Sequence, residues 1–338
     1  MPMETRKIQV TGGGSSYIVT LPKKWVEETQ HLKKNDPIGI VEQPDGTLLI
    51  TTKKPGEQVR KVKDLDISKI DNPSVLFRLL IGIYIMGFST IEIHSERRIT
   101  PDLRETIQNF TQATIGPEVM SETETMVTIK DLIAPTEMPF DNTLSRMYIL
   151  VKGMHEDAIN ALQKSDTDLA VKIRDRDFNV DRLHWLIARQ SNVVMRDTML
   201  SKEMSVTPEQ AANFFVISRI MERIGDHAVR IADNIPIIIE KAIEKEIVNK
   251  IIAASGMALQ ILANSVSAWE MGDITKANET IESISSLVEV CEDIHNDAIR
   301  LQGEPPIAVI YIIESVRRTG EYAVDISEVT INLLMNRD

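Results

Sequence analysis

The C-terminal part of the chain, residues 139–336, is helical in pattern throughout and contains few glycines or prolines. Turn-forming residues interrupt it at four places: Ser165-Asp166, Ser205–Glu209, Gly272-Asp273 and Gly303–Pro306. These breaks predict six long helices, over residues 141–164, 168–200, 208–240, 242–271, 274–302 and 306–336. The helices form two sets of three, so the sequence predicts a duplicated three-helix bundle, with the first bundle at 139–238 and the second at 241–336.

The third helices of the two sets support this duplication. Gly225 aligns with Gly320 and Ala228 with Ala323, at a constant separation of 95 residues. On a helical wheel the charged residues of the first of these helices share one arc, and four isoleucines lie opposite. The charged residues are Arg219, Glu222, Asp226, Arg230 and Asp233, and the isoleucines are Ile217, Ile220, Ile224 and Ile231.

Both helices carry acidic pairs four residues apart, Glu222 with Asp226 and Glu321 with Asp325. Each such pair costs an isolated helix about 0.2–0.5 kcal/mol. A solvated face is one explanation of the pattern. The other is a metal site, because stacked carboxylates recover this cost when they hold a hard or intermediate cation.

The second helix of the first set adds Asp177, Asp181 and His184 on one face. A lone histidine on a helix is more often structural than a ligand, and His227 is predicted to point into the bundle. The candidate metal ligands are therefore Asp177, Asp181, Glu222, Asp226, Glu321 and Asp325.

The stretch Glu222-x3-Asp226-x3-Arg230 resembles the E/D-xxx-D-xxx-R signature of the PhoU family, and the resemblance covers about 139–336. It implies tandem three-helix bundles that regulate phosphate uptake and, as in some members, a multinuclear iron or zinc cluster on the signature helices. Arg230 is then a candidate for binding phosphate or another anion. The second repeat departs from the signature, since Arg317 replaces the leading acid and Asp325 replaces the arginine. A cluster there would need Glu314 or Glu328 as a substitute.

The N-terminal part, residues 1–55, has a different pattern. It predicts four short strands with a short helix over 23–29, and the strands lie at Lys7–Thr11, Tyr17–Leu21, Ile38–Val41 and Thr47–Thr51. So short a module cannot bury much surface alone and is expected to dimerise or to dock on a partner. It is also basic: residues 1–63 carry eleven Lys and Arg against seven Asp and Glu, a net +4, in a chain of net charge −12.

Residues 6–54 resemble the AbrB/SpoVT swapped-hairpin DNA-binding domain. The features that match are a Gly-rich turn, Val19–Trp25 and Leu32–Asp36, in which Asn35 stands where the family has glycine. Asn tolerates a positive φ, so we expect one at Asn35. The resemblance implies a DNA-binding homodimer of interleaved strands, and the combination of both domains is most similar to archaeal regulators. The candidate DNA contacts are Arg6, Lys7, Lys23 and Lys24; the alternatives are an ordinary solvated set and a dimerisation or partner module.

Residues 64–136 are predicted to form a small α/β linker domain, in which no chemistry is evident. It should contain a helix over 72–86, a strand at Thr90–His94, a helix that starts at Pro101 with Thr100 as its N-cap, and a strand over 123–129. The predicted fold class is thus mainly α: tandem three-helix bundles preceded by a small β swapped-hairpin domain and a short α/β linker domain.

Composition excludes several classes of protein. The single cysteine, Cys291, excludes an intrachain disulfide and a cysteine-built zinc site, and indicates the cytoplasm. We expect neither a signal peptide nor membrane insertion, because the longest apolar stretch, 75–88, is short and contains Arg78.

Together these features predict a cytoplasmic, DNA-binding transcriptional regulator of phosphate uptake, whose acidic helical part senses through metal, phosphate or partner proteins. The alternative is a signalling adaptor that contacts a phosphate transporter ATPase or a sensor kinase without binding DNA. A metal-dependent hydrolase is disfavoured, because the sequence shows neither a general base beside the carboxylates nor a phosphate-binding loop. We therefore expect a protein that is not an enzyme.

Overall fold

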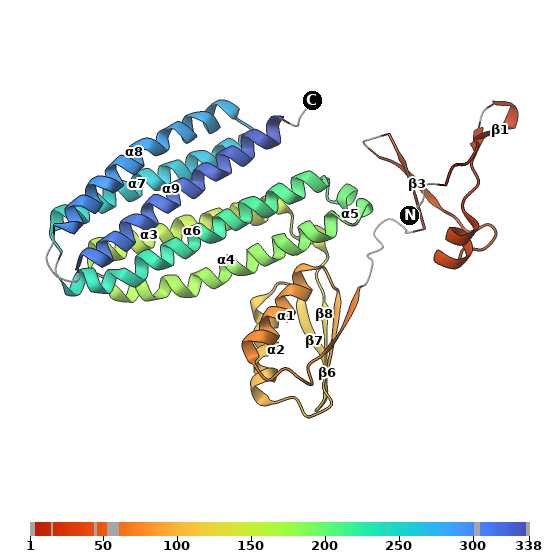
Figure 1. The fold of residues 1–338 in the computed structure, drawn as a ribbon, viewed down its shortest axis with the longest axis horizontal. Helices are drawn as coiled ribbons and strands as arrows, with labels where there is room; N and C mark the ends of the chain where they lie inside the picture. Colours follow the sequence, from red (N-terminus) through yellow and green to blue (C-terminus); the bar gives the residue numbers. More distant parts are fainter. Residues whose placement is uncertain are drawn as a thin grey trace. The chain divides into compact units, whose positions relative to one another are not determined.

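The computed structural model describes residues 4–14, 16–43, 46–52, 61–241, 243–300 and 305–335. The chain divides into two compact units, Met1–Gln58 and Val59–Asp338. The first unit contains small strand hairpins, and the second consists mainly of long helices (Figure 1). The predicted fold class is confirmed.

The N-terminal unit contains two separate antiparallel hairpins. Strand β1 (Gln9–Thr11) pairs with β2 (Ser16–Ile18), and β3 (Gly39–Glu42) pairs with β4 (Leu48–Thr51). A helical turn, Trp25–Thr29, lies between the hairpins in sequence. Asn35 has a φ of 73°, so the positive φ expected at this position is confirmed.

The second unit begins with a four-stranded sheet in the order β5-β6-β8-β7, which α1 and α2 cover on one side (Figure 1). Strands β5 and β6 are parallel, whereas β8 is antiparallel to both of its neighbours. Helix α1 begins after an Asn72 N-cap and α2 after a Thr100 N-cap. The elements are β5 (Val62–Asp66), α1 (Pro73–Ile85), β6 (Thr90–His94), α2 (Pro101–Ala113), β7 (Pro117–Glu122) and β8 (Met126–Asp131). Strands β5 and β7 were not predicted from the sequence.

The helical body follows as two bundles of three long helices (Figure 1). Helices α3, α4 and α6 pack together, as do α7, α8 and α9, and α6 against α9 joins the two bundles. The helices are α3 (Phe140–Lys164), α4 (Thr167–Val194), α5 (Thr198–Glu203), α6 (Pro208–Glu240), α7 (Lys245–Met271), α8 (Ile274–Ile299) and α9 (Pro305–Met335). All four isoleucines predicted to lie opposite the charged arc of α6 are buried.

The prediction of one continuous helix over 168–200 was wrong at its C-terminal end. Helix α4 ends at Val194, and the side chain of Asp197 accepts hydrogen bonds from the amides of Met199 and Leu200 to start the short helix α5. The side chain of an aspartate can cap a new helix and so interrupt a helical segment. The periodicity of apolar residues does not reveal this interruption.

Within the described residues, one helix is long and apolar enough to cross a membrane by length and composition, namely α7. This corrects the sequence-based expectation that the chain holds no such segment. In the structure α7 packs against α8 and α9, and half of its most apolar window is buried. The core helix of a helical bundle has this composition too.

The α/β domain is attached to the helical body through α4. Helix α1 packs against α4, and the ring of Phe77 lies edge-on to that of Trp185, with 6.2 Å between the ring centroids. Arg189 of α4 forms an ion pair with Asp131 and donates a hydrogen bond to the carbonyl oxygen of Tyr84 at 2.6 Å. Gln190 donates to the carbonyl oxygens of Pro135 and Met138.

Candidate functional site

Four of the predicted metal ligands lie on the facing helices of the first bundle. Asp177 and Asp181 are one turn apart on α4, and Glu222 and Asp226 are one turn apart on α6. Burial, and then the charges of Asp177, Glu222 and Asp226, raise the pKa of Asp181 to about 7. The pKa of Asp177 is raised to about 6 by burial and then by Asp226 and Glu222. We call these four residues the carboxylate cluster.

Glycine at position 225 brings the two helices of the carboxylate cluster together. A Cβ atom on Gly225 would lie 3.0 Å from Oδ1 of Asp177, so any larger residue would crowd this carboxylate. The same Oδ1 atom is buried and has no hydrogen-bond partner. A buried carboxylate oxygen without a partner is costly, and either a proton or a cation would relieve it.

Two arginines on α6 partly offset the charge of the cluster. Burial raises the pKa of both Glu222 and Asp226, while Arg219 and Arg223 act to lower it. The predicted anion ligand Arg230 is exposed and lies 5.2 Å from the centre of the Tyr311 ring on α9. Among the described residues Arg230 makes no ion pair.

The cluster fits a hard or intermediate cation in charge and in donor chemistry, because two facing helices each contribute two carboxylates and one oxygen lacks a partner. The side chains do not already form a coordination shell, since no three His, Cys, Asp or Glu side chains in the described ranges are placed to hold one metal ion. Cation binding would therefore require side-chain rotation within the cluster.

His184, which lies on the same helix as two cluster residues, is a structural core residue. It is buried, its Nδ1 lies 3.0 Å from the Ser218 hydroxyl, and its ring stacks on Phe215. Burial lowers its pKa to about 4. The expectation that a lone histidine is structural agrees with this placement.

The two ligands predicted in the second bundle have a different environment. Glu321 forms ion pairs with Arg317 and Arg318, which also bind Glu314. Burial raises the pKa of Asp325, and the neighbouring Glu328 raises it further. The residue that contacts the aligned glycine, Gly320, is Leu287 rather than an aspartate.

A buried histidine between the two bundles was missed by the sequence analysis. His155 of α3 is fully buried, with Nε2 2.8 Å from the Ser255 hydroxyl of α7 and Nδ1 3.4 Å from the Thr319 hydroxyl of α9. His227, predicted to point inward, is half-buried beside Tyr322, and its Nδ1 is buried without a partner. No sequence signal marked His155, because its partners lie 100 and 164 residues away.

The candidate DNA contacts of the N-terminal unit all lie in solvent. Arg6 forms an ion pair with Glu4, and Lys23 pairs with Glu27 at 3.6 Å. Lys7 and Lys24 are also exposed. These four side chains are therefore accessible to a phosphate backbone.

The N-terminal unit has no hydrophobic core of its own in its described part, since no described side chain in residues 4–52 is fully buried. Tyr17 is 73% exposed and Ile40 is 62% exposed, although both lie in strands. The other exposed large apolar residues of this unit are Ile8, Val10, Ile18, Val19, Ile38 and Leu48. We call these eight the exposed hairpin residues.

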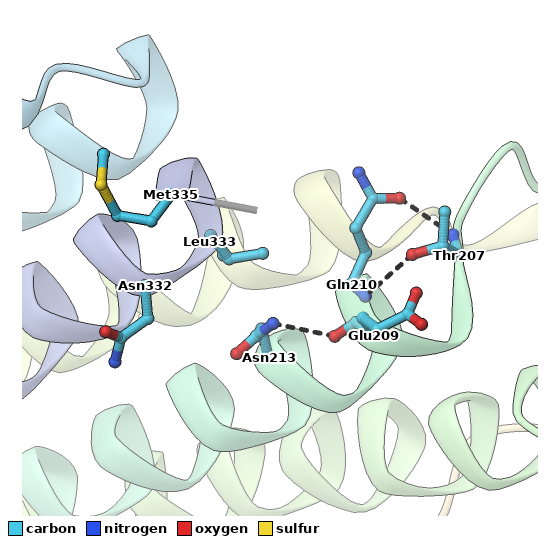
Figure 2. Close-up of a pocket in the computed structure, with 7 residues that line it drawn as sticks. All are labelled: Thr207, Glu209, Gln210, Asn213, Asn332, Leu333 and Met335. Carbon is cyan, nitrogen blue, oxygen red and sulfur yellow. Dashed lines mark hydrogen bonds between the residues drawn. The ribbon is translucent and has the colours of Figure 1, made fainter. Parts of the chain in front are cut away.

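A pocket of about 630 Å³ lies where α6 begins and α9 ends (Figure 2). Thr207 and Gln210 are tied there by reciprocal hydrogen bonds that cap α6. Asn213, Asn332, Leu333 and Met335 lie around them (Figure 2). None of the predicted site residues lines this pocket.

Two family models match the chain. The model of the PhoU domain matches residues 144–235, which include the carboxylate cluster. The model described as antidote-toxin recognition MazE, a bacterial antitoxin, matches residues 10–58. The predicted combination of a PhoU domain with an AbrB-like N-terminal domain is confirmed, whereas the matches do not show an archaeal origin.

A curated relative and a solved structure resemble the helical part. The chain is 23% identical over 199 residues to the phosphate-specific transport system accessory protein PhoU homolog 1 of Thermotoga maritima, covering 56% of this chain and 82% of that protein. The crystal structure of PhoU from Pseudomonas aeruginosa matches with a TM-score of 0.51 at 19% identity, covering 59% of this chain and 96% of that one. This structural likeness concerns the fold alone.

Proposed function

We propose that this protein is a cytoplasmic transcriptional regulator of phosphate uptake that binds DNA as a homodimer. The observation that carries the proposal is the union of a PhoU domain with a small basic unit that has no core of its own in its described part. The relative from Thermotoga maritima is named for phosphate-specific transport, which supports phosphate as the regulated nutrient. The proposal gives the protein no catalytic role.

The exposed hairpin residues support the homodimer. Two-stranded hairpins are marginally stable alone, and eight large apolar side chains on a unit of this size need a cover. A second copy of the unit supplies a matching apolar surface by two-fold symmetry. The dimer would also present Arg6, Lys7, Lys23 and Lys24 twice to a duplex.

The carboxylate cluster is proposed as the sensing site, with iron or zinc held by Asp177, Asp181, Glu222 and Asp226. A bound cation would supply a positive charge that phosphate can ligate. Arg230, which has no ion-pair partner among the described residues, would then be available to a second anionic oxygen.

DNA binding is tested by fluorescence anisotropy of labelled DNA from upstream of the protein's own gene, over a salt series. A duplex binder loses affinity as salt rises, with a slope of about −0.9 per neutralised phosphate. The variant Lys23→Ala/Lys24→Ala should bind more weakly and show a shallower slope. Lys172→Ala/Lys245→Ala removes the same charge from exposed positions of the helical body and should leave binding unchanged.

A second candidate function is a signalling adaptor that binds a transporter ATPase or a sensor kinase and not DNA. The description of the N-terminal match as a recognition domain of an antitoxin favours this candidate, because it points to a protein partner. Negligible DNA binding at low salt, together with co-purification of such a partner, would establish the adaptor and exclude the regulator.

A further inference from the structure

The two repeats carry different charges at equivalent positions of their third helices. The alignment that pairs Gly225 with Gly320 also pairs Glu222 with Arg317, which exchanges sign, and Asp226 with Glu321, which keeps it. Two further positions exchange sign: Arg219 aligns with Glu314, and Arg230 with Asp325. The fold is repeated, whereas the arrangement of charge is not.

In the second bundle the acidic side chains are already bound by a side-chain cation. Arg317 donates hydrogen bonds from Nη2 to both carboxylate oxygens of Glu314 at 2.8 Å, and from Nη1 to Glu321. Arg318 adds bonds to Glu314 at 3.0 Å and to Glu321 at 3.1 Å. Burial acts to raise the pKa of Glu314, but the hydrogen bonds from these arginines lower it on balance. In the first bundle, by contrast, the pKa values of all four carboxylates of the cluster are raised.

The helix that faces the signature positions also differs between the repeats. A Cβ atom on Gly225 would meet Asp177 on α4, whereas a Cβ atom on Gly320 would clash with the Cδ2 methyl group of Leu287 on α8. Four residues further along these helices stand Asp181 and Cys291. Burial raises the pKa of the Cys291 thiol to about 12, so it is not a thiolate and is a poor metal ligand. The second bundle thus has no carboxylates on α8 at the positions that correspond to Asp177 and Asp181 of α4.

We propose that the guanidinium of Arg317 takes, in the second bundle, the place that a divalent cation takes in the first, so that only the first bundle binds such a cation. A planar guanidinium suits this role because it stays charged and bonds both oxygens of a carboxylate in a fixed geometry. The inference rests on the cation site proposed for the carboxylate cluster, and it makes the two repeats chemically unequal.

The experiment measures Mn²⁺ binding to the full chain by isothermal titration calorimetry. Binding to the wild-type protein should be lost in Asp177→Asn/Glu222→Gln and kept in Glu321→Gln/Asp325→Asn. In Arg317→Glu, which restores the acid at the position aligned with Glu222, the number of Mn²⁺ ions bound per chain should rise by about one over the wild type. Lys164→Glu is the control: it makes the same charge change at an exposed position of α3, outside the network of Glu314, Arg317 and Glu321, and should bind as the wild type does.

A second measurement applies if Arg317→Glu does not fold. Arg317→Gln should lower the Tm by roughly 2–4 °C in the absence of metal, and Mn²⁺ should restore at least half of that loss. Arg317→Lys keeps the charge and should show the metal response of the wild type.

The inference is overturned if Glu321→Gln/Asp325→Asn abolishes wild-type binding, or if Mn²⁺ neither binds additionally to Arg317→Glu nor restores the Tm of Arg317→Gln. If the wild-type protein binds no Mn²⁺, the cation site of the first bundle is wrong. In that case the inference fails for the first bundle, and the Arg317 variants decide only whether Arg317 occupies a cation position in the second bundle, because their result is a difference from the wild type.

Discussion

Gly225 of α6 lies against Asp177 of α4, and a Cβ atom at position 225 would be 3.0 Å from the Asp177 Oδ1 atom. An alanine in a helix interior normally gains about 0.5–1 kcal/mol over glycine. In Gly225→Ala this gain should be cancelled by displacement of Asp177, so the free energy of unfolding stays level or falls. Gly256→Ala is the control, because a Cβ at Gly256 on α7 has nothing within 4 Å. Urea unfolding in which both variants gain equally would contradict the contact.

The ion pair between Arg189 and Asp131 fixes the α/β domain to α4. The two atoms Nη2 and Oδ2 are 2.6 Å apart, and the side chains are only 8% and 10% exposed. Removing one partner of such a pair costs about 3–5 kcal/mol, because the other charge is left buried. Arg189→Met should therefore destabilise strongly, and Arg189→Met/Asp131→Asn should recover part of the loss.

Trp185 provides the signal for this experiment, since it lies in the same interface beside Phe77. In a Trp25→Phe/Trp269→Phe background, its fluorescence during urea unfolding reports on attachment of the domain. Arg196→Met is the control, because Arg196 is exposed and its side chain makes only long hydrogen bonds in the described residues, to the Met86 carbonyl oxygen at 3.4 Å and to Met86 Sδ at 3.9 Å. If Arg196→Met lowers the free energy of unfolding as much as Arg189→Met does, the ion pair makes no specific contribution to stability.

Acid should loosen the junction between the bundles at His155. Burial lowers its pKa from 6.5 to about 4, so between these values the unfolded chain binds a proton that the folded chain does not. The free energy of unfolding therefore falls as the pH falls from about 6.5 to 4, by up to about 1.4 kcal/mol per pH unit for this group. His155→Gln should reduce this slope, whereas the same substitution at the exposed His295 should not. Equal slopes in all three proteins would exclude this role of His155.

Asp181 should act in the opposite sense in metal-free protein. Burial and then its acidic neighbours raise its pKa from 3.8 to about 7, so the folded chain holds a proton that the unfolded chain has released. Stability is lost as the pH rises from about 4 to 7. Asp181→Asn should be more stable than the wild type at pH 8, by about 1–2 kcal/mol, and equal to it below pH 4. Thermal unfolding in a chelator, with the exposed Asp175→Asn as control, measures this difference.

The helical body could be predicted because its signals are local. Caps, breaks and the isoleucine stripe of α6 specify each helix within a few residues, and Gly225 and Gly320 mark the duplication. The end of α4 was mispredicted because Asp197 competes as a cap within a helical pattern. Strands β5 and β7 were missed because they are the edge strands of the sheet, with mostly exposed side chains and little alternation.

The carboxylate cluster was predictable from residue type and spacing. The pairing of the acidic residues of the second bundle with arginine was not. That Arg317 bonds Glu314 and Glu321, and that Leu287 faces Gly320, are facts of packing between helices distant in sequence. The polar contacts of His155 have the same origin. Sequence periodicity indicates which side of a helix is buried, but it does not indicate which partner lies there.

The lack of buried side chains in the described N-terminal hairpins makes their folding a bimolecular event under the proposed homodimer. The concentration of folded N-terminal dimers then rises roughly as the square of the protein concentration when the protein is scarce. The folding of the helical body does not depend on the protein concentration in this way. DNA binding would thus require a minimum expression level. Below that level the helical body is folded but the N-terminal unit is not. A cell could adjust the response by the amount of protein it makes, with no change in ligand affinity.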